Sequence, residues 1–520
     1  MWRRSCALTL LGLVGSLLHV LAGQPISPAR TPADPVVVNT IVNLLEQSHE
    51  LDAQVMRGSQ LLTLSRQTEL VSRFRADLGQ QWANELLALS RNLEGDGPSS
   101  ARNTAMRVLI RLDPNRALEL LDRADLGEAA GTAFTPAAAE VPQAVFSAIV
   151  GRDGTGALPL LQQAADRLGA RGHYPYAALG YAAIEASNPF WRSDKQRAIE
   201  ILRSVFDPAL DRYMKANRQY SDDFEFGTML QVLAGGLPFD VVQPALHEFV
   251  KSLLAMDLSK YELGVEVYTR DGNKIVVSNP ADATLTYFGQ LVNRDSELAQ
   301  QLSAERPALR AGLEATREGN VRSMTFGRSF QAASIRRPAT QQFQTRNDAM
   351  AFAHINADAA IAKAEQLPAD QRGSTLLDVA RGIAGEHPDR AAELIASVQR
   401  DAGSPDLRMQ LNVTSAQASV AASQGNRDAL RELLRRGFEL AAQVTGTVQN
   451  HAAGNFTPGL PRMVQVGIQN ERELTVAFLD AVPPSGEKAE LLLSAADALA
   501  SSARLPMGSR SGPARPSQVQ

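Results

Sequence analysis

The stretch Arg116-Ala117-Leu118-Glu119-Leu120-Leu121 decides the fold, because the same pattern returns twice later in the chain. The later copies read Arg197-Ala198-Ile199-Glu200-Ile201-Leu202 and Arg390-Ala391-Ala392-Glu393-Leu394-Ile395. From the alanine onward, apolar residues stand at i, i+3, i+4 and i+7, which places them on one face of a helix. The Arg and Glu of each copy stand at i and i+3, where they can pair on the outer surface. Each copy therefore predicts an amphipathic helix.

Proline separates each of these helices from the helix before it. Asp113-Pro114 and His387-Pro388 stand two residues before the first and third copies, and Asn188-Pro189 precedes the second. Proline suits the first turn of a helix and is costly in its interior. The pattern thus predicts helical hairpins whose second helix carries the repeated face. We expect an all-α fold, an irregular solenoid-like array of α-hairpins.

Helix pairs with these features resemble the broad class of tetratricopeptide-like and HEAT-like helical repeat proteins. A degenerate copy at 428–434 extends the resemblance, although the three main copies lie 81 and 193 residues apart and the tetratricopeptide Trp-Leu-Gly-Tyr pattern is missing. The resemblance implies stacked α-hairpins, an architecture known better for binding than for chemistry. It points to no specific family and carries no family function.

A second apolar stripe begins before the first copy. Apolar residues follow one another at spacings of three or four from Leu70 to Leu93, and Gly95-Asp96-Gly97-Pro98 comes next. This spacing predicts one long amphipathic helix over residues 70–93, with the stripe packed against the core.

Two segments interrupt the helical pattern. Residues 265–269 and 274–278 are rich in Val and Ile on either side of Asp271-Gly272, which is a strong signal for a β-hairpin. Residues 321–346 hold five arginines and no Asp or Glu. We interpret this second segment as a flexible linker between domains. A patch for an anionic ligand or a membrane surface is the alternative.

These interruptions divide a chain that exceeds the usual size of one compact core. We expect a signal peptide at 1–23, an N-terminal helical-repeat domain at 24–320 with the hairpin near 265–278, an Arg-rich linker at 321–346, a C-terminal helical domain at 347–505 and a disordered tail at 506–520.

The first residues have the pattern of an export signal. Arg3 and Arg4 precede an apolar run from Ala7 to Ala22, which is shorter than the roughly 20 residues of a membrane-spanning helix. Position 24 is Gln, whereas a bacterial lipoprotein signal requires Cys there, and the sole cysteine, Cys6, leaves with the signal. We therefore expect an exported protein, periplasmic or extracellular, without a membrane anchor, an attached lipid or a disulfide.

Motifs for catalysis and cofactor binding are missing from the sequence. His247-Glu248 would begin a zinc-protease motif, but Lys251 stands where its second histidine belongs. No Gly-rich turn has the spacing of a dinucleotide site or the lysine of a P-loop. The formal net charge of −4, which becomes −6 once Arg3 and Arg4 are removed, gives no reason to expect nucleic acid. We therefore predict no catalytic residues, no metal, no cofactor and no nucleic-acid partner.

One concentration of side chains stands out. All eight tyrosines lie between Tyr174 and Tyr287, close to an acidic cluster formed by Asp222, Asp223 and Glu225. Aromatic faces beside carboxylates suit sugars, peptides or cations, and the acids could act as a general acid and base. The competing interpretation is a core that uses large side chains. If the region binds a ligand, we expect these residues to form the site: Tyr174, Tyr176, Trp191, Tyr213, Tyr220, Asp222 and Asp223.

Two function classes remain. We favour an exported helical-repeat scaffold or binding protein whose partner is a protein, a peptide or an envelope component. The alternative is an envelope glycan-processing enzyme resembling lytic transglycosylases, some of which carry long α-solenoids. Gly227-Thr228-Met229-Leu230-Gln231 loosely echoes their Gly-Leu-Met-Gln motif, but the catalytic Glu-Ser that should precede it is absent. The sequence therefore favours binding over catalysis.

The export signal makes a prediction about covalent state. Because the apolar run is short and Gln occupies position 24, the mature protein should begin near Gly23 or Gln24 and carry no lipid. The intact mass of exported protein measures this. A retained signal or the added mass of an acyl chain would contradict it.

Overall fold

The computed structural model describes residues 34–52, 57–91, 93, 96–123, 136–172, 174–259, 261, 263–328, 338–401, 406–447 and 459–502. Helix accounts for 80% of the structure, and the described strands form one small antiparallel sheet. The expected all-α fold with a β-hairpin is therefore confirmed. The expected signal peptide at 1–23 and the expected tail at 506–520 lie outside the described residues.

The chain folds into two compact units. Unit 1 holds the described residues from 87 to 328, and unit 2 holds those of 34–86 together with those of 338–502. This division differs from the expected boundary, because residues 34–86 fold with the C-terminal part of the chain and not with the rest of 24–320. Unit 2 is thus built from two segments that are far apart in sequence.

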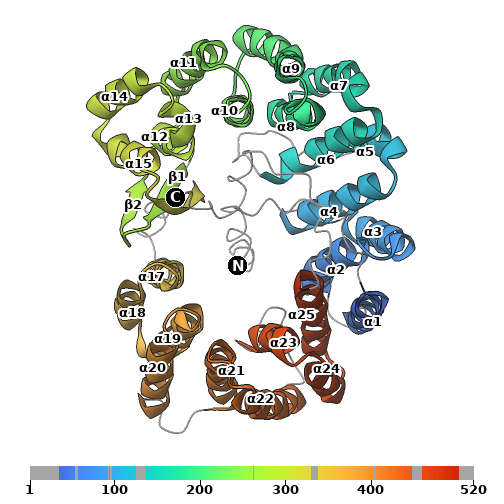
Figure 1. The fold of residues 1–520 in the computed structure, drawn as a ribbon, viewed down its shortest axis with the longest axis vertical. Coiled ribbons are helices and arrows are strands. Elements are labelled where there is room, and N and C mark those ends of the chain that lie inside the picture. The colour runs from blue at the N-terminus through green and yellow to red at the C-terminus, as the bar shows by residue number, and fades with distance from the viewer. Residues whose placement is uncertain are drawn as a thin grey trace. The chain divides into compact units, whose positions relative to one another are not determined.

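Unit 1 contains two layers of helices (Figure 1). The first layer is α4 (Asp96–Leu112), α6 (Pro136–Asp153), α8 (Tyr176–Ser187) and α10 (Tyr220–Leu233). The second layer is α5 (Ala117–Arg123), α7 (Leu158–Ala170), α9 (Lys195–Lys215) and α11 (Phe239–Ala255). Helices alternate between the layers along the chain, as the hairpin prediction requires. The unit continues with α12 (Pro280–Tyr287), α13 (Gly289–Val292), α14 (Ser296–Glu305) and α15 (Pro307–Arg317).

The amino-acid pattern of each helix reflects its layer. The α8 sequence is apolar nearly all round, and α8 packs against α6 and α10 within its layer and against α9 in the other. A helix covered on several sides has little need for charged residues. By contrast, α9 buries one stripe, which includes the predicted face of Ala198, Ile201 and Leu202. In the other two copies Ala117, Leu120, Leu121, Ala391, Ile395 and Val398 are buried as well, whereas Leu394 of the third copy is only half-buried.

Unit 2 repeats this two-layer plan. Its first layer is α17 (Pro338–Ala353), α19 (Ala369–Ile383), α21 (Leu407–Ser423), α23 (Leu460–Asn470), α25 (Gly486–Ser502) and α2 (Arg57–Val71). Its second layer is α18 (Ala357–Glu365), α20 (Pro388–Asp401), α22 (Arg427–Thr447), α24 (Arg472–Ala481) and α1 (Pro35–Asp52). The boundary between the units falls within α3 (Ala76–Ser90).

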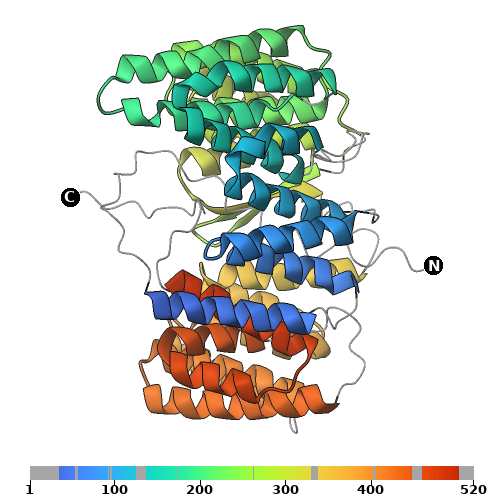
Figure 2. The same ribbon diagram turned by 90° about the vertical axis from the view of Figure 1, so that its right-hand side faces the viewer.

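The two segments of unit 2 meet where α1 packs along α25 (Figure 2). Buried side chains of α1, including Ile41 and Leu45, supply the apolar contact area. A buried hydrogen bond also crosses the junction, because Ser48 Oγ donates to the carbonyl of Ala489 at 2.6 Å. Gln67 Nε2 on α2 donates to the same Ser48 Oγ at 2.8 Å. The first and last described helices of the chain are thus neighbours in one core.

The single long helix expected over 70–93 is wrong. Helix α2 ends at Val71 and α3 begins at Ala76, so the apolar stripe is shared by two helices. Arg75 stands in the break and pairs with Asp77 in the first turn of α3, with Nε 2.9 Å from Oδ1. An unbroken spacing of apolar residues therefore did not require an unbroken helix, since each short helix buries its own part of the stripe.

The sheet has three antiparallel strands in the order β2-β1-β3. The expected hairpin is formed by β1 (Leu263–Thr269) and β2 (Lys274–Val277), and Gly272 in its turn has a φ of +87°. The third strand, β3 (Val321–Arg328), pairs with β1, so this part of the expected linker is a strand. Residues 329–337 of that linker lie outside the described residues.

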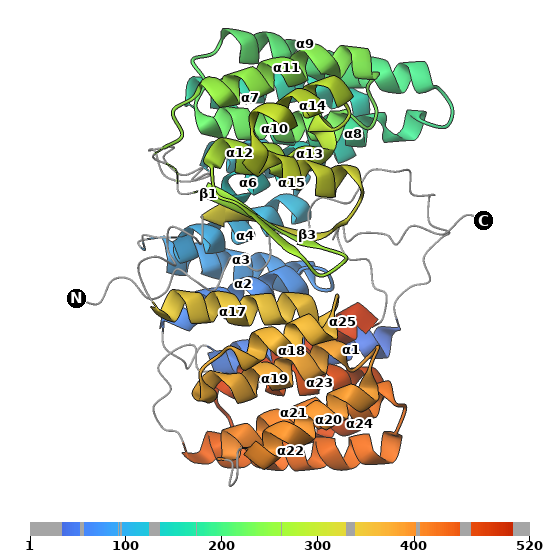
Figure 3. The ribbon, with the colours of Figure 1, turned by 90° about the vertical axis from the view of Figure 1, so that its left-hand side faces the viewer.

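Burial explains why β3 joins the sheet. Its Val321, Met324 and Phe326 pack against a core that includes Val265 and Val267 of β1. The sheet lies against α12 and α15 (Figure 3), and Ala283 and Ala315 of these helices share a core with Val265 and Val267 of β1. A two-stranded hairpin alone is only marginally stable in water. The third strand and the helices on the sheet supply the apolar contacts that it lacks.

The packing of α1 on α25 predicts that unit 2 depends on the first described helix. Leu45→Ala removes a side chain that is fully buried and should destabilise unit 2 by about 2–5 kcal/mol. The matched control is Val36→Ala, because Val36 is on the same helix and is 71% exposed. Hydrogen exchange should show faster opening of α25 in the Leu45 variant alone. Unchanged protection of α25 would show that α1 is not part of its core.

Candidate functional site

The aromatic residues singled out in the sequence lie in the core of unit 1. Tyr174, Tyr176, Tyr213 and Tyr220 are all buried, near the junction of α8, α9 and α10. The rings pack on one another and on Phe226: the Tyr213 and Phe226 rings are stacked with centroids 3.7 Å apart, and the Tyr176 ring meets Phe226 edge-on at 5.5 Å. These rings therefore present their faces to other side chains and not to solvent.

The carboxylate of Asp223 is buried among these rings. Tyr213 donates its hydroxyl to Asp223 Oδ1 at 2.6 Å, and Ser252 Oγ on α11 lies 3.0 Å from Oδ2. Burial raises the pKa of Asp223 to about 6, although the bonds from Tyr213 and Ser252 and the charge of Arg218 lower it. Asp223 thus joins α9, α10 and α11 in one buried hydrogen-bond network.

Two other acids of the same helix have capping roles. Glu225 is 1% exposed, and its Oε2 accepts from the backbone nitrogen of Ala177 at 3.3 Å. Since Pro175 offers α8 no side-chain cap, Glu225 of α10 caps that helix from outside. Burial raises the pKa of Glu225 to about 8. Asp222 is half-buried and accepts from the backbone nitrogen of Gln219, which closes the capping box of α10.

Trp191 is half-buried at the end of the turn after α8. Its Nε1 donates to Ser187 Oγ at 3.2 Å, and its ring covers Gly236, where a Cβ would lie 2.7 Å from Cζ2. Of the seven candidate residues, only Trp191 and Asp222 reach solvent in part. The structure thus brings six of the seven together at the start of α8, the end of α9 and the start of α10, whereas Trp191 follows the opposite end of α8. A ligand site drawing on all of them stays a prediction.

The loose resemblance at 227–231 to a transglycosylase motif has a packing explanation. Gly227 lies within α10, and a Cβ there would lie 2.9 Å from the Phe249 ring and 3.0 Å from the Phe288 ring. Glycine at this position lets α10 approach those rings. The motif-like glycine is therefore accounted for by the core.

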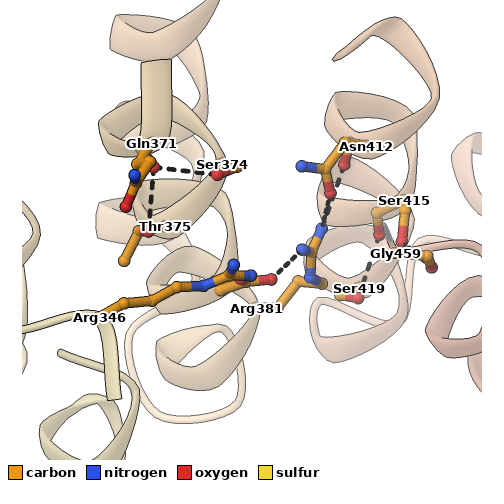
Figure 4. Close-up of polar contacts among 10 residues, drawn as sticks. Arg346, Gln371, Ser374, Thr375, Arg381, Asn412, Ser415, Ser419 and Gly459 are labelled. Carbon is orange, nitrogen blue, oxygen red and sulfur yellow. Dashed lines mark hydrogen bonds and ion pairs between the residues drawn. The ribbon is translucent and has the colours of Figure 1, made fainter. Parts of the chain in front are cut away.

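A second cluster, in unit 2, is polar and partly open to solvent. We call it the polar seam: Arg346 on α17, Asp378 and Arg381 on α19, and Asn412 and Ser415 on α21 (Figure 4). Arg346 Nη2 lies 3.0 Å from Asp378 Oδ2, and Arg381 pairs with the other oxygen of that carboxylate. Arg381 Nη1 also donates to Asn412 Oδ1 at 2.8 Å and to the Asn412 carbonyl at 3.2 Å. The seam thus links three first-layer helices in series.

A fourth first-layer helix meets the seam at its N-terminus. Ser415 Oγ donates to the carbonyl of Gly459, the residue before α23, at 2.6 Å. Gly459 has a φ of +86°, and a Cβ there would lie 2.9 Å from both Asn412 Oδ1 and Ser415 Oγ. Glycine is required here for the left-handed backbone and for space.

The electrostatics of the seam are unbalanced. Two guanidinium groups share the single carboxylate of Asp378, so these three side chains carry one net positive charge. The side chain of Arg381 is 8% exposed and that of Asp378 is 18% exposed, whereas that of Arg346 is 41% exposed. The less exposed Asp378 and Arg381 therefore hold the more exposed Arg346 in position. An exposed, positioned guanidinium can bind a carboxylate or phosphate group.

Of the residues in the polar seam, the sequence pointed only to Arg346. Arg346 ends the Arg-rich segment for which an anionic-ligand patch was the alternative interpretation. The sequence gives no reason to place Asp378 or Arg381 beside Arg346, because their helices come together only through tertiary packing. The available signal was the i, i+3 spacing of Asp378 and Arg381, which is common on any helix surface.

Among the described residues, no helix is long and apolar enough to cross a membrane, and no group of three or more His, Cys, Asp or Glu side chains could hold a metal ion. The chain was compared with family models, with curated proteins and with solved structures, and none of the three comparisons found a match. Evidence for function therefore comes from the residues and the fold.

The buried carboxylates predict a pH dependence of stability in unit 1. Because the pKa of Glu225 is raised from 4.5 to about 8, the folded state holds a proton that the unfolded state releases above about pH 4.5. Stability contributed by this group is present at low pH and is lost as the pH rises through about 8. Glu225→Gln keeps an acceptor for Ala177 and should remove that loss.

The measurement is hydrogen exchange in α8 and α10 from about pH 6 to about pH 8, corrected for the intrinsic exchange rate. A local readout is needed because Asp52 in unit 2 also has a raised pKa, of about 7, from its burial and the charges of Glu490 and Glu85. Asp211→Asn, at an exposed position of α9, is the control. If protection from exchange in α8 and α10 depends on pH equally in the wild type and the Glu225 variant, the prediction is contradicted.

Proposed function

We propose that the protein is an exported helical-repeat scaffold that binds a protein, a peptide or another envelope component, in the periplasm or outside the cell. The export part rests on the sequence of residues 1–23. The binding part rests on the architecture and on the polar seam.

The observation that carries the proposal is the seam on the first layer of unit 2. Stacked hairpins hold side chains from successive helices at fixed spacing, which is how helical-repeat proteins build extended binding surfaces. In the seam, Arg346, Asp378, Arg381 and Asn412 come from three such helices and are joined by hydrogen bonds. This arrangement offers a rigid, partly exposed polar surface that needs no ordering when a partner binds.

The alternative, an envelope glycan-processing enzyme, gains no support from the acidic cluster. Asp223 and Glu225 are buried and bonded to Tyr213, Ser252 and the start of α8, so neither lies beside an open site. A general acid and base for glycan cleavage must flank the bond that they cleave. Binding is therefore the function that the geometry supports better.

A retention experiment tests the proposal. Mature protein immobilised on a matrix should retain a specific component from an extract of its own envelope, in a manner that excess free mature protein abolishes. A peptidoglycan zymogram run beside it tests the alternative. Failure to retain any component would count against a scaffold, and clearing of the peptidoglycan would replace binding with catalysis as the function.

A further inference from the structure

Two first-layer helices beside the polar seam carry no acidic residue, since α21 and α23 each contain one arginine and no Asp or Glu. In the layer behind them, α20 contains three acids and two arginines, and α22 contains three acids and four arginines. Helices α21 and α23 thus bring no negative charge toward a bound anion.

Arg346 is the arginine of the seam that has hydrogen-bond donors left for a ligand. It reaches Asp378 through Nη2, and within the described part of the chain its Nε and Nη1 form no hydrogen bond. Arg381 differs, because its two terminal nitrogens are committed to Asp378 and Asn412. Because Nε and Nη1 do not share an edge of the guanidinium, a two-pronged contact with a ligand pairs one of them with the second hydrogen of Nη2.

The same contacts hold Arg346 in place. Asp378 accepts from both arginines, and Arg381 is anchored in turn by the side chain and the backbone of Asn412. An unrestrained arginine loses rotamer entropy when it is fixed. Because Arg346 is already restrained in the free protein, a ligand need not supply most of that cost.

From this geometry we propose that Arg346, positioned by Asp378 and Arg381, is a subsite for a carboxylate group of the partner, either the C-terminus or an Asp or Glu side chain of a peptide. This inference rests on the proposed function and specifies its partner. The charge of the seam selects a carboxylate over a phosphate, because the three charged side chains sum to one positive charge, which one carboxylate neutralises. Two parallel hydrogen bonds to the guanidinium can then hold that carboxylate.

The first arm of the test uses a small probe on the full mature protein. N-acetylglutamate should raise the melting temperature, measured at constant ionic strength, whereas N-acetylglutamine amide, in which both carboxylates are replaced by neutral amides, should not. Arg346→Gln should abolish the rise. Arg390→Gln is the matched control, because Arg390 is 43% exposed and pairs with Asp358 away from the seam. An equal rise with N-acetylglutamine amide, a larger rise with phosphate, or a rise that survives in the Arg346 variant would each overturn the proposal.

The second arm measures retention of the envelope component. Arg346→Gln should weaken retention at least about tenfold, the effect of losing one charged hydrogen-bonded contact, and Arg390→Gln should not. Arg346→Lys keeps the charge but loses the two-pronged geometry. The Lys variant should therefore retain less of the component than the wild type and more than Arg346→Gln. Circular dichroism confirms that the variants are folded.

The outcomes separate this inference from the proposed function. Equal retention by wild type and Arg346→Gln would overturn the carboxylate subsite and leave the scaffold function in place. If no component is retained, but N-acetylglutamate raises the melting temperature of the wild type and not of Arg346→Gln, the subsite stands and the scaffold function fails.

Discussion

Burial of first-layer helices on several sides is the constraint on which the rest of the structure depends. Such a helix has little surface left for water, so it must be apolar nearly all round, as α8 is, or must pair each polar side chain that it carries. On α21, Asn412, Thr414 and Ser415 are all buried, and each has a hydrogen-bond partner. Asn412 and Ser415 thereby connect α21 to α19 and to the residue before α23, whereas Thr414 bonds within α21 itself.

Helix α10 of unit 1 and the polar seam of unit 2 meet this constraint with different chemistry. On α10 the buried acids are Asp223 and Glu225, whose pKa values are raised by burial. The seam instead pairs charged groups, because Arg346 is half open to water and its pair with Asp378 keeps contact with solvent. The same architecture thus holds buried capping and core carboxylates at one place and an exposed guanidinium at another.

The distribution of aromatic and acidic residues in the sequence predicted a binding site in unit 1 and not at the polar seam of unit 2. Rings beside acids are what many binding sites contain, and unit 1 concentrates both between Tyr174 and Glu225. Yet Tyr213 uses its hydroxyl on Asp223, and Tyr220 shares a hydrogen bond with Thr284 at 2.8 Å. A buried tyrosine needs such a partner, so acids and hydroxyls near aromatic residues are also what a large core requires. The sequence could not separate the two cases.

The sequence by itself determined the local structure of this protein. Apolar periodicity in the three copies predicted the buried helix faces, proline positions predicted the hairpins, and Asp271-Gly272 predicted the β-turn, because each depends on residues within a few positions of one another. Only the tertiary structure decided the rest. The pairing of β3 with β1, the packing of α1 on α25 and the contact of Arg346 with Asp378 each join residues far apart in the chain. Local periodicity carries no information about such partners, since many alternative neighbours would bury the same apolar face equally well.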